Sequence, residues 1–434
     1  QISKVCAMAP SADTQLLNSH DPMHHRKRFN RAFLLPIERA KKKRCLAHEP
    51  SPIFSNGKPS VCDPRDWIMR NPSMIRIAGN HPFNAEAPLS QLLDSGFITP
   101  TPLHFVRNHG AVPTATWDDW KLEIGGLVKK PVTLTMNELT TKFPSLEFPA
   151  TIVSSGDRRK EQSMVSPLIP LNWGSGAVST SVWRGVPLWI VLQRCEVKNG
   201  DYYVRFEGGD SYPGEETTYN TSIKLEYAMD PANDIILAYK QNGDLLHPDH
   251  GFPLRVIIPG ITGGRMLKWL ERITVTSSDN LHEDSNLAGE EVCPENGVNS
   301  VIARPSHSEI IPANVVTGEK PYLVRGYAYG GGGRKVTRVE VTLDGGETWR
   351  SCDVKYHAKP SRYRKYWFWC FWWIQMEVAD LSGAKEIAVR AWDDLGNTQP
   401  ENLKGNANNC WFRVKINKSD AGLRFEHPNG PAVG

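Results

Sequence analysis

The sequence predicts a mixed α+β domain followed by an all-β sandwich. Its 434 residues exceed the size at which one hydrophobic core usually stops growing, which favours two domains. Short strands alternate with helical segments up to residue 298, whereas residues 299–417 hold regular short strands between Gly, Pro and Asp turns. We expect domains at 71–298 and 299–417, an N-terminal extension at 1–70 and a linker at 418–434.

Residues 1–70 are rich in Pro, Ser, Asn, His and basic residues and show little hydrophobic periodicity. Segments of this kind rarely bury enough apolar surface to order themselves, so we expect a mostly flexible extension. Its basic clusters at 24–28 and 41–44 are expected to be solvated. The alternative is a nuclear-import or anion-binding patch.

In the first domain, local patterns predict individual elements. Residues 120–126 alternate and turn like a strand and hairpin, and residues 135–142 begin with the Thr-x-x-Glu signature of a helix. Residues 182–195 carry apolar residues at helical spacing. Residues 235–239 and 254–258 are short apolar strands. No Gly-x-Gly-x-x-Gly follows a strand, so a dinucleotide-binding fold is not expected.

The second domain contains a strongly aromatic run at residues 366–374, Tyr-Trp-Phe-Trp-Cys-Phe-Trp-Trp-Ile. Successive side chains of a strand point to opposite faces, so both faces of this strand need burial. One face can fill the sandwich core. The other needs a partner surface, which is either the first domain or a second subunit.

The composition argues against several classes of protein. The 51 basic and 47 acidic residues give a net charge of +4, so the charge balance gives no reason to expect nucleic-acid binding. The eight cysteines form no C-x-x-C pair, which argues against a zinc site or a disulfide framework and favours reduced cytoplasmic thiols. The longest apolar run has eight residues, against about 20 for a membrane span. No secretory signal is recognised.

The stretch 151–162 joins an apolar strand to a small-residue turn and three consecutive cations. Gly156 permits a tight turn, and Arg158, Arg159 and Lys160 leave the turn able to hold an oxyanion bidentately. This is a candidate anion or metal site. The alternative is a solvated surface, where most runs of charge lie.

Six segments place this stretch in a wider pattern. They are HPFNAEAPL (81–89), FVRNHGAVP (105–113), SSGDRRKEQ (154–162), NWGSGAVSTSVWRGVPL (172–188), DHGFPLRVIIPGITGGRMLKWL (249–270) and AWDDLGNTQPE (391–401). In these segments the chain resembles the molybdenum domain of eukaryotic assimilatory nitrate reductases, members of the sulfite oxidase family. Six ordered matches are far more specific than one short motif.

The resemblance implies a sulfite-oxidase-like molybdopterin-binding domain and an immunoglobulin-like sandwich that mediates homodimerisation. It also implies reduction of nitrate to nitrite by oxygen-atom transfer to molybdenum held by a pterin. No side chain performs that chemistry, so the protein must hold the cofactor and place cations around it. The haem and FAD domains that donate electrons in the family are expected beyond this chain. A sulfite oxidase-type enzyme is the alternative.

Candidate site residues follow from the matching segments. Arg107 and Arg159 match the family's substrate-pocket arginines, and a structural ion pair is the alternative for each. Thr398 and Asn286 match substrate-side positions. The residues expected to bind the pterin and its phosphate are Asn84, Ala85, Glu86, Phe105, Val106, Arg107, Asn108, His109, Asp210, His250, Arg255, Met266, Leu267 and Lys268. For His250, a satisfied turn histidine is the alternative.

One departure from the family pattern lies at the expected metal ligand. The family has a cysteine thiolate where this chain has Ser154, and an asparagine where it has Asp157. A thiolate is a soft, strongly donating ligand, whereas a serine hydroxyl is weak until it is deprotonated. Three interpretations of Ser154 remain. The chain is an inactive variant, engineered or natural, that still binds the cofactor as a dimer, or Ser154 binds the metal as an alkoxide. The third is an error in the sequence.

Overall fold

The computed structural model describes residues 67–79, 81–165, 171–211, 218–278, 295–316, 321–402 and 409–428. Within these ranges the chain is mostly β, which corrects the expected α+β class, because the helices there are few and have at most seven residues. The helices are α1 (Leu89–Asp94), α2 (Met136–Lys142), α3 (Arg159–Val165), α4 (Leu188–Arg194), α5 (Leu225–Met229), α6 (Ala313–Val316) and α7 (Val378–Gly383). None of these is long and apolar enough to cross a membrane.

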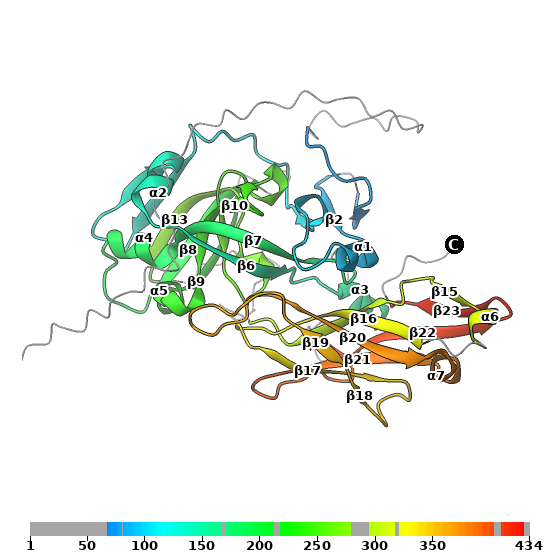
Figure 1. Cartoon of the computed structure of the whole chain (residues 1–434). Helices are drawn as coiled ribbons and strands as arrows, with labels where there is room; N and C mark the ends of the chain where they lie inside the picture. The colour runs from blue at the N-terminus through cyan, green and yellow to red at the C-terminus, as the bar shows by residue number, and fades with distance from the viewer. Residues whose placement is uncertain are drawn as a thin grey trace, which may run out of the picture. The chain divides into compact units, whose positions relative to one another are not determined.

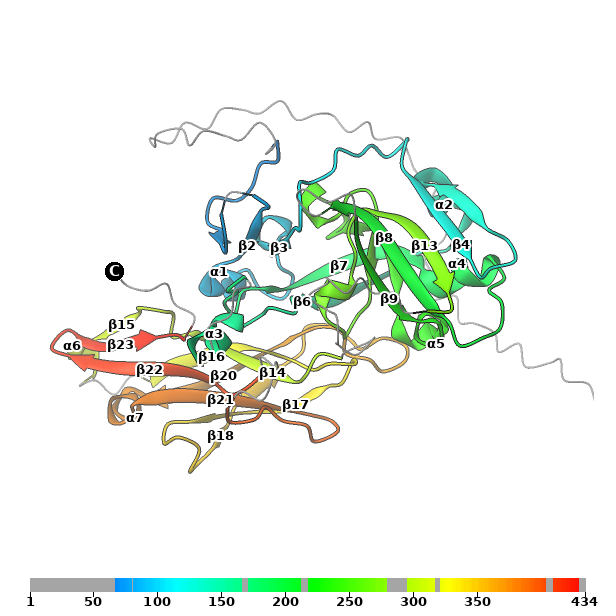
Figure 2. The same ribbon diagram turned by 180° about the vertical axis from the view of Figure 1, so that it is seen from behind.

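Three sheets form the described part of the chain before residue 279 (Figure 2). The first has the order β1 (Ile75–Arg76), β2 (Asn84–Glu86), β3 (Val106–Arg107). The second has the order β11 (Asp244–Leu245), β10 (Ile236–Gln241), β7 (Val178–Pro187), β6 (Leu146–Val153), and β12 (Arg255–Ile257) also pairs with β10. The third has the order β5 (Val132–Thr135), β4 (Lys121–Gly126), β13 (Leu270–Thr276), β8 (Tyr203–Ser211), β9 (Thr218–Lys224).

The local patterns of this part were mostly predictive. The strands expected at 120–126, 235–239 and 254–258 correspond to β4, β10 and β12. Helix α2 begins with the expected capping box, in which the Thr135 hydroxyl accepts from the Glu138 N–H at 3.2 Å and the Glu138 carboxylate accepts from the Thr135 N–H at 3.1 Å.

The helix expected over 182–195 is wrong in its first half. Residues 182–187 complete β7, which pairs with β6 on one side and β10 on the other, and α4 starts only after Pro187. Trp183 and Val186 are fully buried in this central strand. A strand that is buried on both faces does not alternate, so its apolar residues imitated helical spacing.

Two further sheets form the described part after residue 295 (Figure 1). One has the order β14 (Asn299–Arg304), β16 (Pro321–Tyr329), β20 (Cys370–Glu377), β19 (Asp353–Lys355). The other has the order β15 (Ile310–Pro312), β23 (Gly422–Glu426), β22 (Phe412–Ser419), β21 (Glu386–Asp393), β17 (Val336–Thr342), β18 (Arg350–Ser351). Residues of both sheets, such as Trp372 and Phe412, belong to one buried cluster, so we call the pair of sheets the sandwich.

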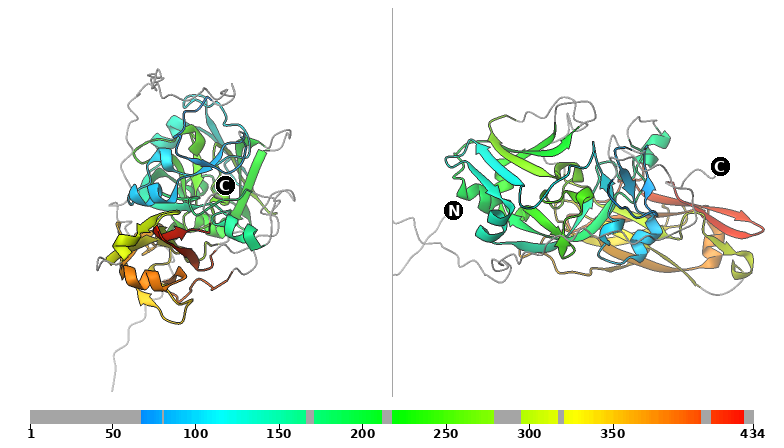
Figure 3. Two further views of the ribbon diagram at one scale, coloured as in Figure 1. Left: turned by 90° about the vertical axis from the view of Figure 1, so that its right-hand side faces the viewer. Right: turned by 90° about the horizontal axis from the view of Figure 1, so that it is seen from above.

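The linker predicted at 418–434 starts too early. Residues 418–419 still belong to β22, which pairs with β23 in an antiparallel arrangement. The two strands are red in Figure 3. Leu423 and Phe425 are buried in the sandwich core, which explains why this segment is ordered. The turn between the strands was missed because it is only two residues long. Residues 429–434 lie outside the described ranges.

The aromatic run of the sandwich is covered by the first domain, one of the two surfaces expected for it. Trp367 belongs to the core cluster of the first domain, and its indole N–H donates to the Asp234 carboxylate at 2.8 Å. The Trp369 backbone N–H donates to the Thr151 hydroxyl at 2.8 Å, and the Thr151 N–H donates to the Trp367 carbonyl at 2.8 Å. The aromatic run therefore holds β6, the strand that leads into Ser154.

Candidate active site

A cavity of about 390 Å³ lies where β6 ends and the loops around β3 and β12 meet. Segments far apart in the sequence contribute its walls. Among the residues predicted for the site, those that line it are Phe105, Arg107, His109, Ser154, Arg159, Asp210, His250, Arg255, Met266, Leu267 and Lys268. The fold therefore gathers both substrate-type arginines, the candidate metal ligand and most of the candidate phosphate ligands around one space.

Other predicted residues stand behind this lining or away from it. Asn84, Ala85, Glu86, Val106, Asn108 and Thr398 are not among the residues that line the cavity. The Asn84 side-chain oxygen accepts from Arg107 at 3.3 Å, so Asn84 supports a lining residue. Thr398 lies on the sandwich, where its hydroxyl donates to the Ala391 carbonyl at 2.9 Å. Asn286 falls outside the described residues.

One corner of the cavity is built around Lys268. Its ammonium group donates to the Asp249 backbone carbonyl at 3.0 Å and to the side-chain oxygen of Asn108. The Asp249 carboxylate accepts two hydrogen bonds from Arg70, at 2.7 and 3.0 Å, and one from Asn108 at 3.2 Å. Burial lowers the pKa of Lys268 to about 7, although Asp210 and Asp249 raise it. An anion bound here would return this lysine to its charged form.

Arg255 is the second cation of this corner and is almost fully buried. Its two terminal nitrogens donate to the His250 and Met266 carbonyls at 3.1 and 3.2 Å, and its guanidinium lies 5.1 Å from the Trp183 ring. Its Nε finds no hydrogen-bond partner in the described part of the chain. Burial lowers the pKa of Arg255 to about 9. A buried cation that donates to neutral carbonyls fits an anionic ligand.

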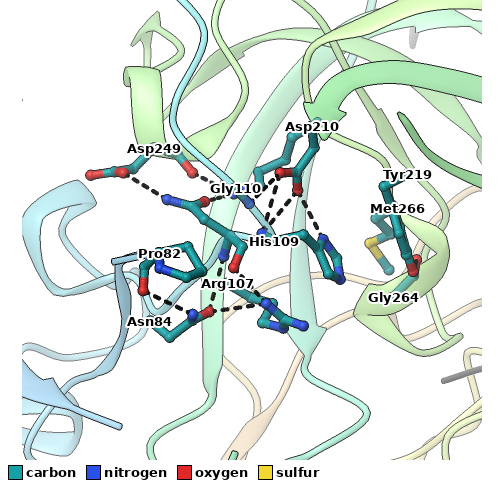
Figure 4. A network of polar contacts seen from close by, with 12 residues as sticks. Pro82, Asn84, Arg107, His109, Gly110, Asp210, Tyr219, Asp249, Gly264 and Met266 are labelled. Carbon is teal, nitrogen blue, oxygen red and sulfur yellow. Dashed lines mark hydrogen bonds and ion pairs between the residues drawn. The ribbon is translucent and has the colours of Figure 1, made fainter. Parts of the chain in front are cut away.

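His109 is held by Asp210, as Figure 4 shows. The Asp210 carboxylate accepts from His109 Nδ1 at 2.9 Å and from the Gly110 N–H at 3.0 Å. The His109 ring also stacks on Tyr219, with 4.1 Å between the ring centres, and the Tyr219 hydroxyl donates to the Gly264 carbonyl at 2.9 Å. Burial lowers the pKa of His109 even though Asp210 raises it. The ring is therefore a fixed hydrogen-bonding group.

His104 was missed by the sequence analysis. His104 lines the cavity. Its position directly before the FVRNHG segment could have identified it as a candidate site residue. Its Nδ1 lies 2.9 Å from the Phe105 carbonyl, and its ring centre lies 4.7 Å from that of His250. Burial lowers the pKa of His104 to about 3 and lowers that of His250 well below its usual value. Burial therefore disfavours the charged form of both rings, so His250 offers polarity rather than charge.

The turn after β6 presents Ser154 and Arg159 to the cavity. The Ser154 N–H donates to the Ala177 carbonyl at 2.9 Å, and the Ser154 hydroxyl accepts from the Gly156 N–H at 3.2 Å. A Cβ at Gly156 would come within 2.4 Å of Trp173, another lining residue that the sequence analysis missed. Glycine is therefore required for the turn to pass this ring.

Only one of the three consecutive cations serves the cavity. Arg158 is fully buried away from it and forms a two-point ion pair with Glu161, at 2.7 and 2.8 Å. Lys160 is not a lining residue. The expectation that all three cations form one oxyanion site is therefore wrong, because Arg158, whose backbone is left-handed (φ 62°), is engaged by Glu161 instead.

The donor set fits a cofactor that carries a phosphate and a polar ring system. Buried Arg255, whose Nε has no partner among the described residues, and Lys268 with its lowered pKa suit the phosphate. His109 and His250 suit polar ring atoms. Arg107 and Arg159 remain on the lining beside Ser154, as a small oxyanion would require.

Comparisons with known proteins agree with this geometry. Residues 109–283 match the family described as oxidoreductase molybdopterin binding domain, and residues 291–419 match the Mo-co oxidoreductase dimerisation domain. The chain is 54% identical over 417 residues to nitrate reductase [NADH] 1 of Arabidopsis thaliana, a match that covers 87% of this chain. It is 56% identical over 412 residues, or 86% of this chain, to nitrate reductase [NADH] 2 of Phaseolus vulgaris.

The chain spans 46% of the length of each of these two relatives. Among solved structures, it is similar to the sulfane dehydrogenase SoxCD from Paracoccus pantotrophus, with a TM-score of 0.65 and 22% identity over 88% of this chain and 98% of that one. This likeness supports the fold, and the two family matches together run from residue 109 to residue 419. The chain thus contains an oxidoreductase molybdopterin binding domain followed by a Mo-co oxidoreductase dimerisation domain.

Proposed function

We propose that this chain is the molybdenum-binding part of a nitrate reductase and that it takes part in the reaction nitrate + 2 e⁻ + 2 H⁺ → nitrite + water. The observation that carries the proposal is the presence of Arg107 and Arg159 on the cavity that Ser154 also lines. The high identity to plant nitrate reductases supports nitrate as the substrate.

Charged and neutral side chains of the cavity would have different roles. Arg255 and Lys268 would hold the cofactor phosphate, His109 and His250 would contact its polar ring atoms, and Ser154 would face the metal. The molybdopterin cofactor supplies the redox centre that accepts an oxygen atom, for which no side chain is suited. Arg107 and Arg159 would bind nitrate through planar forks and stabilise the negative charge that remains on its oxygens.

The same reasoning extends to partners. We propose that the sandwich is the immunoglobulin-like domain of a homodimer, which the matching dimerisation domain supports. Haem and FAD domains of a longer protein would deliver the electrons, as the greater length of the relatives suggests. We also propose a reducing, cytoplasmic location, which the free thiols of Cys195, Cys352, Cys370 and Cys410 support.

Ser154 favours a second candidate function, a dimer that binds the cofactor without turnover. A hydroxyl that accepts a hydrogen bond from its own turn is a poorer ligand for a soft metal than the thiolate expected there.

One experiment separates these candidates. The purified chain is assayed for molybdenum and pterin content, for nitrate reduction driven by a reduced viologen, and for sulfite-dependent electron release. Molybdenum with nitrate turnover supports the reductase, and molybdenum with neither turnover supports the non-catalytic dimer. Sulfite-dependent electron release without nitrate turnover would overturn the proposal in favour of a sulfite oxidase.

A further inference from the structure

Arg158 occupies a position that the proposed chemistry does not use. It lies in the turn that begins at Ser154, immediately before Arg159, with its side chain almost completely buried. Its φ of 62° is left-handed, a conformation that costs an arginine energy and that glycine would adopt freely. A strained residue at this point persists only where its surroundings hold it in place.

Residues of the sandwich hold the Arg158 side chain in place. Arg158 Nη1 donates to the Asn299 side-chain oxygen at 2.7 Å and to the Cys410 carbonyl at 2.8 Å. Its Nε and Nη2 engage the Glu161 carboxylate of α3. The guanidinium also lies 5.2 Å from the Phe412 ring. The Arg158 side chain is therefore fixed by the carboxylate of Glu161, which belongs to the same domain, and by acceptors of the sandwich.

The acceptors on the sandwich are themselves fixed. The Asn299 amide N–H donates to the Tyr329 hydroxyl at 3.0 Å. The Gln399 amide donates to the Asn299 oxygen at 3.1 Å and to the Cys410 carbonyl at 2.8 Å. Because each member is held by another, a change in Asn299 or Gln399 displaces the Arg158 guanidinium.

Such a displacement would act directly on the next residue along the chain. Arg159 lines the cavity, and its terminal nitrogen lies 3.5 Å from the Ser155 carbonyl of the same turn. The backbone at Arg158 is tied at both ends of the turn, because the Arg158 N–H donates to the Gly174 carbonyl and the Arg159 N–H donates to the Gly156 carbonyl.

We propose that Arg158 is a positioning residue through which the sandwich sets the direction of Arg159, and thereby the affinity of the cavity for its oxyanion. This rests on the proposed function only in taking nitrate as the oxyanion. It gives the sandwich a role inside each subunit, separate from any role between subunits.

The test uses the cofactor-loaded chain and variants on the sandwich side of the network. Asn299→Ala removes the side-chain acceptor that the sandwich offers to Arg158 without changing a residue that lines the cavity, and Asn299→Asp restores an acceptor of the same size. The matched control is Asp94→Asn, which weakens another contact between the domains, where the Asp94 carboxylate accepts from Arg304 at 2.5 Å and from Arg325 at 2.7 Å.

Nitrate affinity is measured by calorimetric titration, which does not depend on turnover, and KM and kcat are measured wherever turnover exists. Asn299→Ala is expected to raise the Kd and KM for nitrate about tenfold and to change kcat and molybdenum content by less than about twofold. Asn299→Asp is expected to recover most of the affinity, and Asp94→Asn is expected to lower the melting temperature with affinity unchanged.

The inference is overturned if Asn299→Ala and Asp94→Asn leave nitrate affinity equally unchanged, or if they weaken it equally. Arg158→Lys provides a second measurement, because lysine keeps the charge but cannot reach Glu161, Asn299 and Cys410 at once. Its nitrate affinity is expected to fall at least as far as that of Asn299→Ala, and wild-type affinity would overturn the inference. Nitrate binding without turnover in the unmodified chain would contradict the reductase function alone, since the comparison among variants still holds.

Discussion

The hydroxyl of Ser154 accepts a hydrogen bond from the backbone N–H of Gly156 at 3.2 Å. The oxygen expected to face the metal is therefore engaged in stabilising its own turn. A thiol in its place is a weak hydrogen-bond acceptor and a far better ligand for a soft metal.

Ser154→Cys should therefore raise both molybdenum content and nitrate turnover, the latter about tenfold or more, equivalent to about 1.4 kcal/mol. Metal analysis and the viologen-driven assay measure the two quantities. Ser155→Cys, which puts a thiol one residue further along the same lining, is the control and should gain nothing. Unchanged turnover in Ser154→Cys would show that a thiolate is dispensable in this chain.

Arg159→Ala should weaken nitrate use far more than cofactor retention. The loss of one charge-assisted hydrogen-bond pair costs about 1.5–3 kcal/mol, so KM for nitrate should rise roughly tenfold to a hundredfold. Pterin and molybdenum per chain should stay constant. Arg194→Ala, at an exposed arginine of α4, is the matched control. Equal losses of nitrate affinity and of cofactor would contradict the assigned role.

Lys268→Met should stabilise the cofactor-free chain and weaken cofactor retention. Burial lowers the lysine pKa from 10.5 to about 7, so its stabilising contribution is present above pH 10.5 and is lost as pH falls through 7. Methionine removes this pH dependence, and the cofactor-free melting temperature at pH 7 should rise by about 2 °C.

Scanning calorimetry between pH 7 and 10 and fluorescence of the released pterin measure the two effects of Lys268→Met. Lys142→Met, at an exposed lysine of α2, should change neither. A variant that is less stable without cofactor than the unmodified chain would mean that Lys268 is a structural cation.

Glu86→Gln should flatten the pH dependence of stability between pH 5 and 8. The buried Glu86 carboxylate accepts from the Gly174 and Gly176 N–H groups at 2.9 and 3.2 Å. Burial raises its pKa from 4.5 to about 7, so the stability it contributes is fully present below pH 4.5 and is lost as pH rises through 7. Urea unfolding should show a change in this pH dependence of about 2–3 kcal/mol. Parallel curves for the two proteins would exclude a raised pKa.

Trp367→Phe should destabilise the chain without changing nitrate affinity. Phenylalanine keeps most of the packing but leaves the buried Asp234 carboxylate without its 2.8 Å indole donor, which costs about 1–3 kcal/mol. The urea midpoint measures this loss. Trp392→Phe, whose indole N–H donates to Glu340 within the sandwich at 3.1 Å, should leave the attachment between domains intact. A raised KM for nitrate in Trp367→Phe would contradict a purely structural role.

The sequence was sufficient where chemistry is local. The capping box at Thr135, the short strands and the ordered motifs that bring Arg107 and Arg159 to one cavity were all available from residue order. The sequence was insufficient where a side chain contacts residues that are far away along the chain. The ion-pair partner of Arg158, Glu161, is only three residues away, but nothing nearby marks the hydrogen bonds of Arg158 to the sandwich. Their acceptors, Asn299 and Cys410, lie 141 and 252 residues further along the chain.

Burial from both sides and one short turn caused other errors. Residues 182–187 lacked alternation because β7 is covered on both faces. β23 was taken for a linker because the two-residue turn that joins it to β22 was not recognised. His104, which precedes one matching segment, and Trp173, which lies inside another, were missed because a single aromatic residue is more often part of the core than of a cavity lining. Hydrophobic periodicity identifies an element only when one of its faces is exposed to solvent, so it misleads for elements that are buried on both faces.

The insertion of Trp367 into the core of the first domain limits how the protein can be divided. A truncated gene product ending near residue 298 would lose an indole that is only 4% exposed, together with the backbone bonds that tether Thr151. Such a fragment would expose apolar surface beside the strand that carries Ser154, and aggregation would compete with cofactor loading. Laboratory dissection of this protein should therefore keep both domains on one polypeptide.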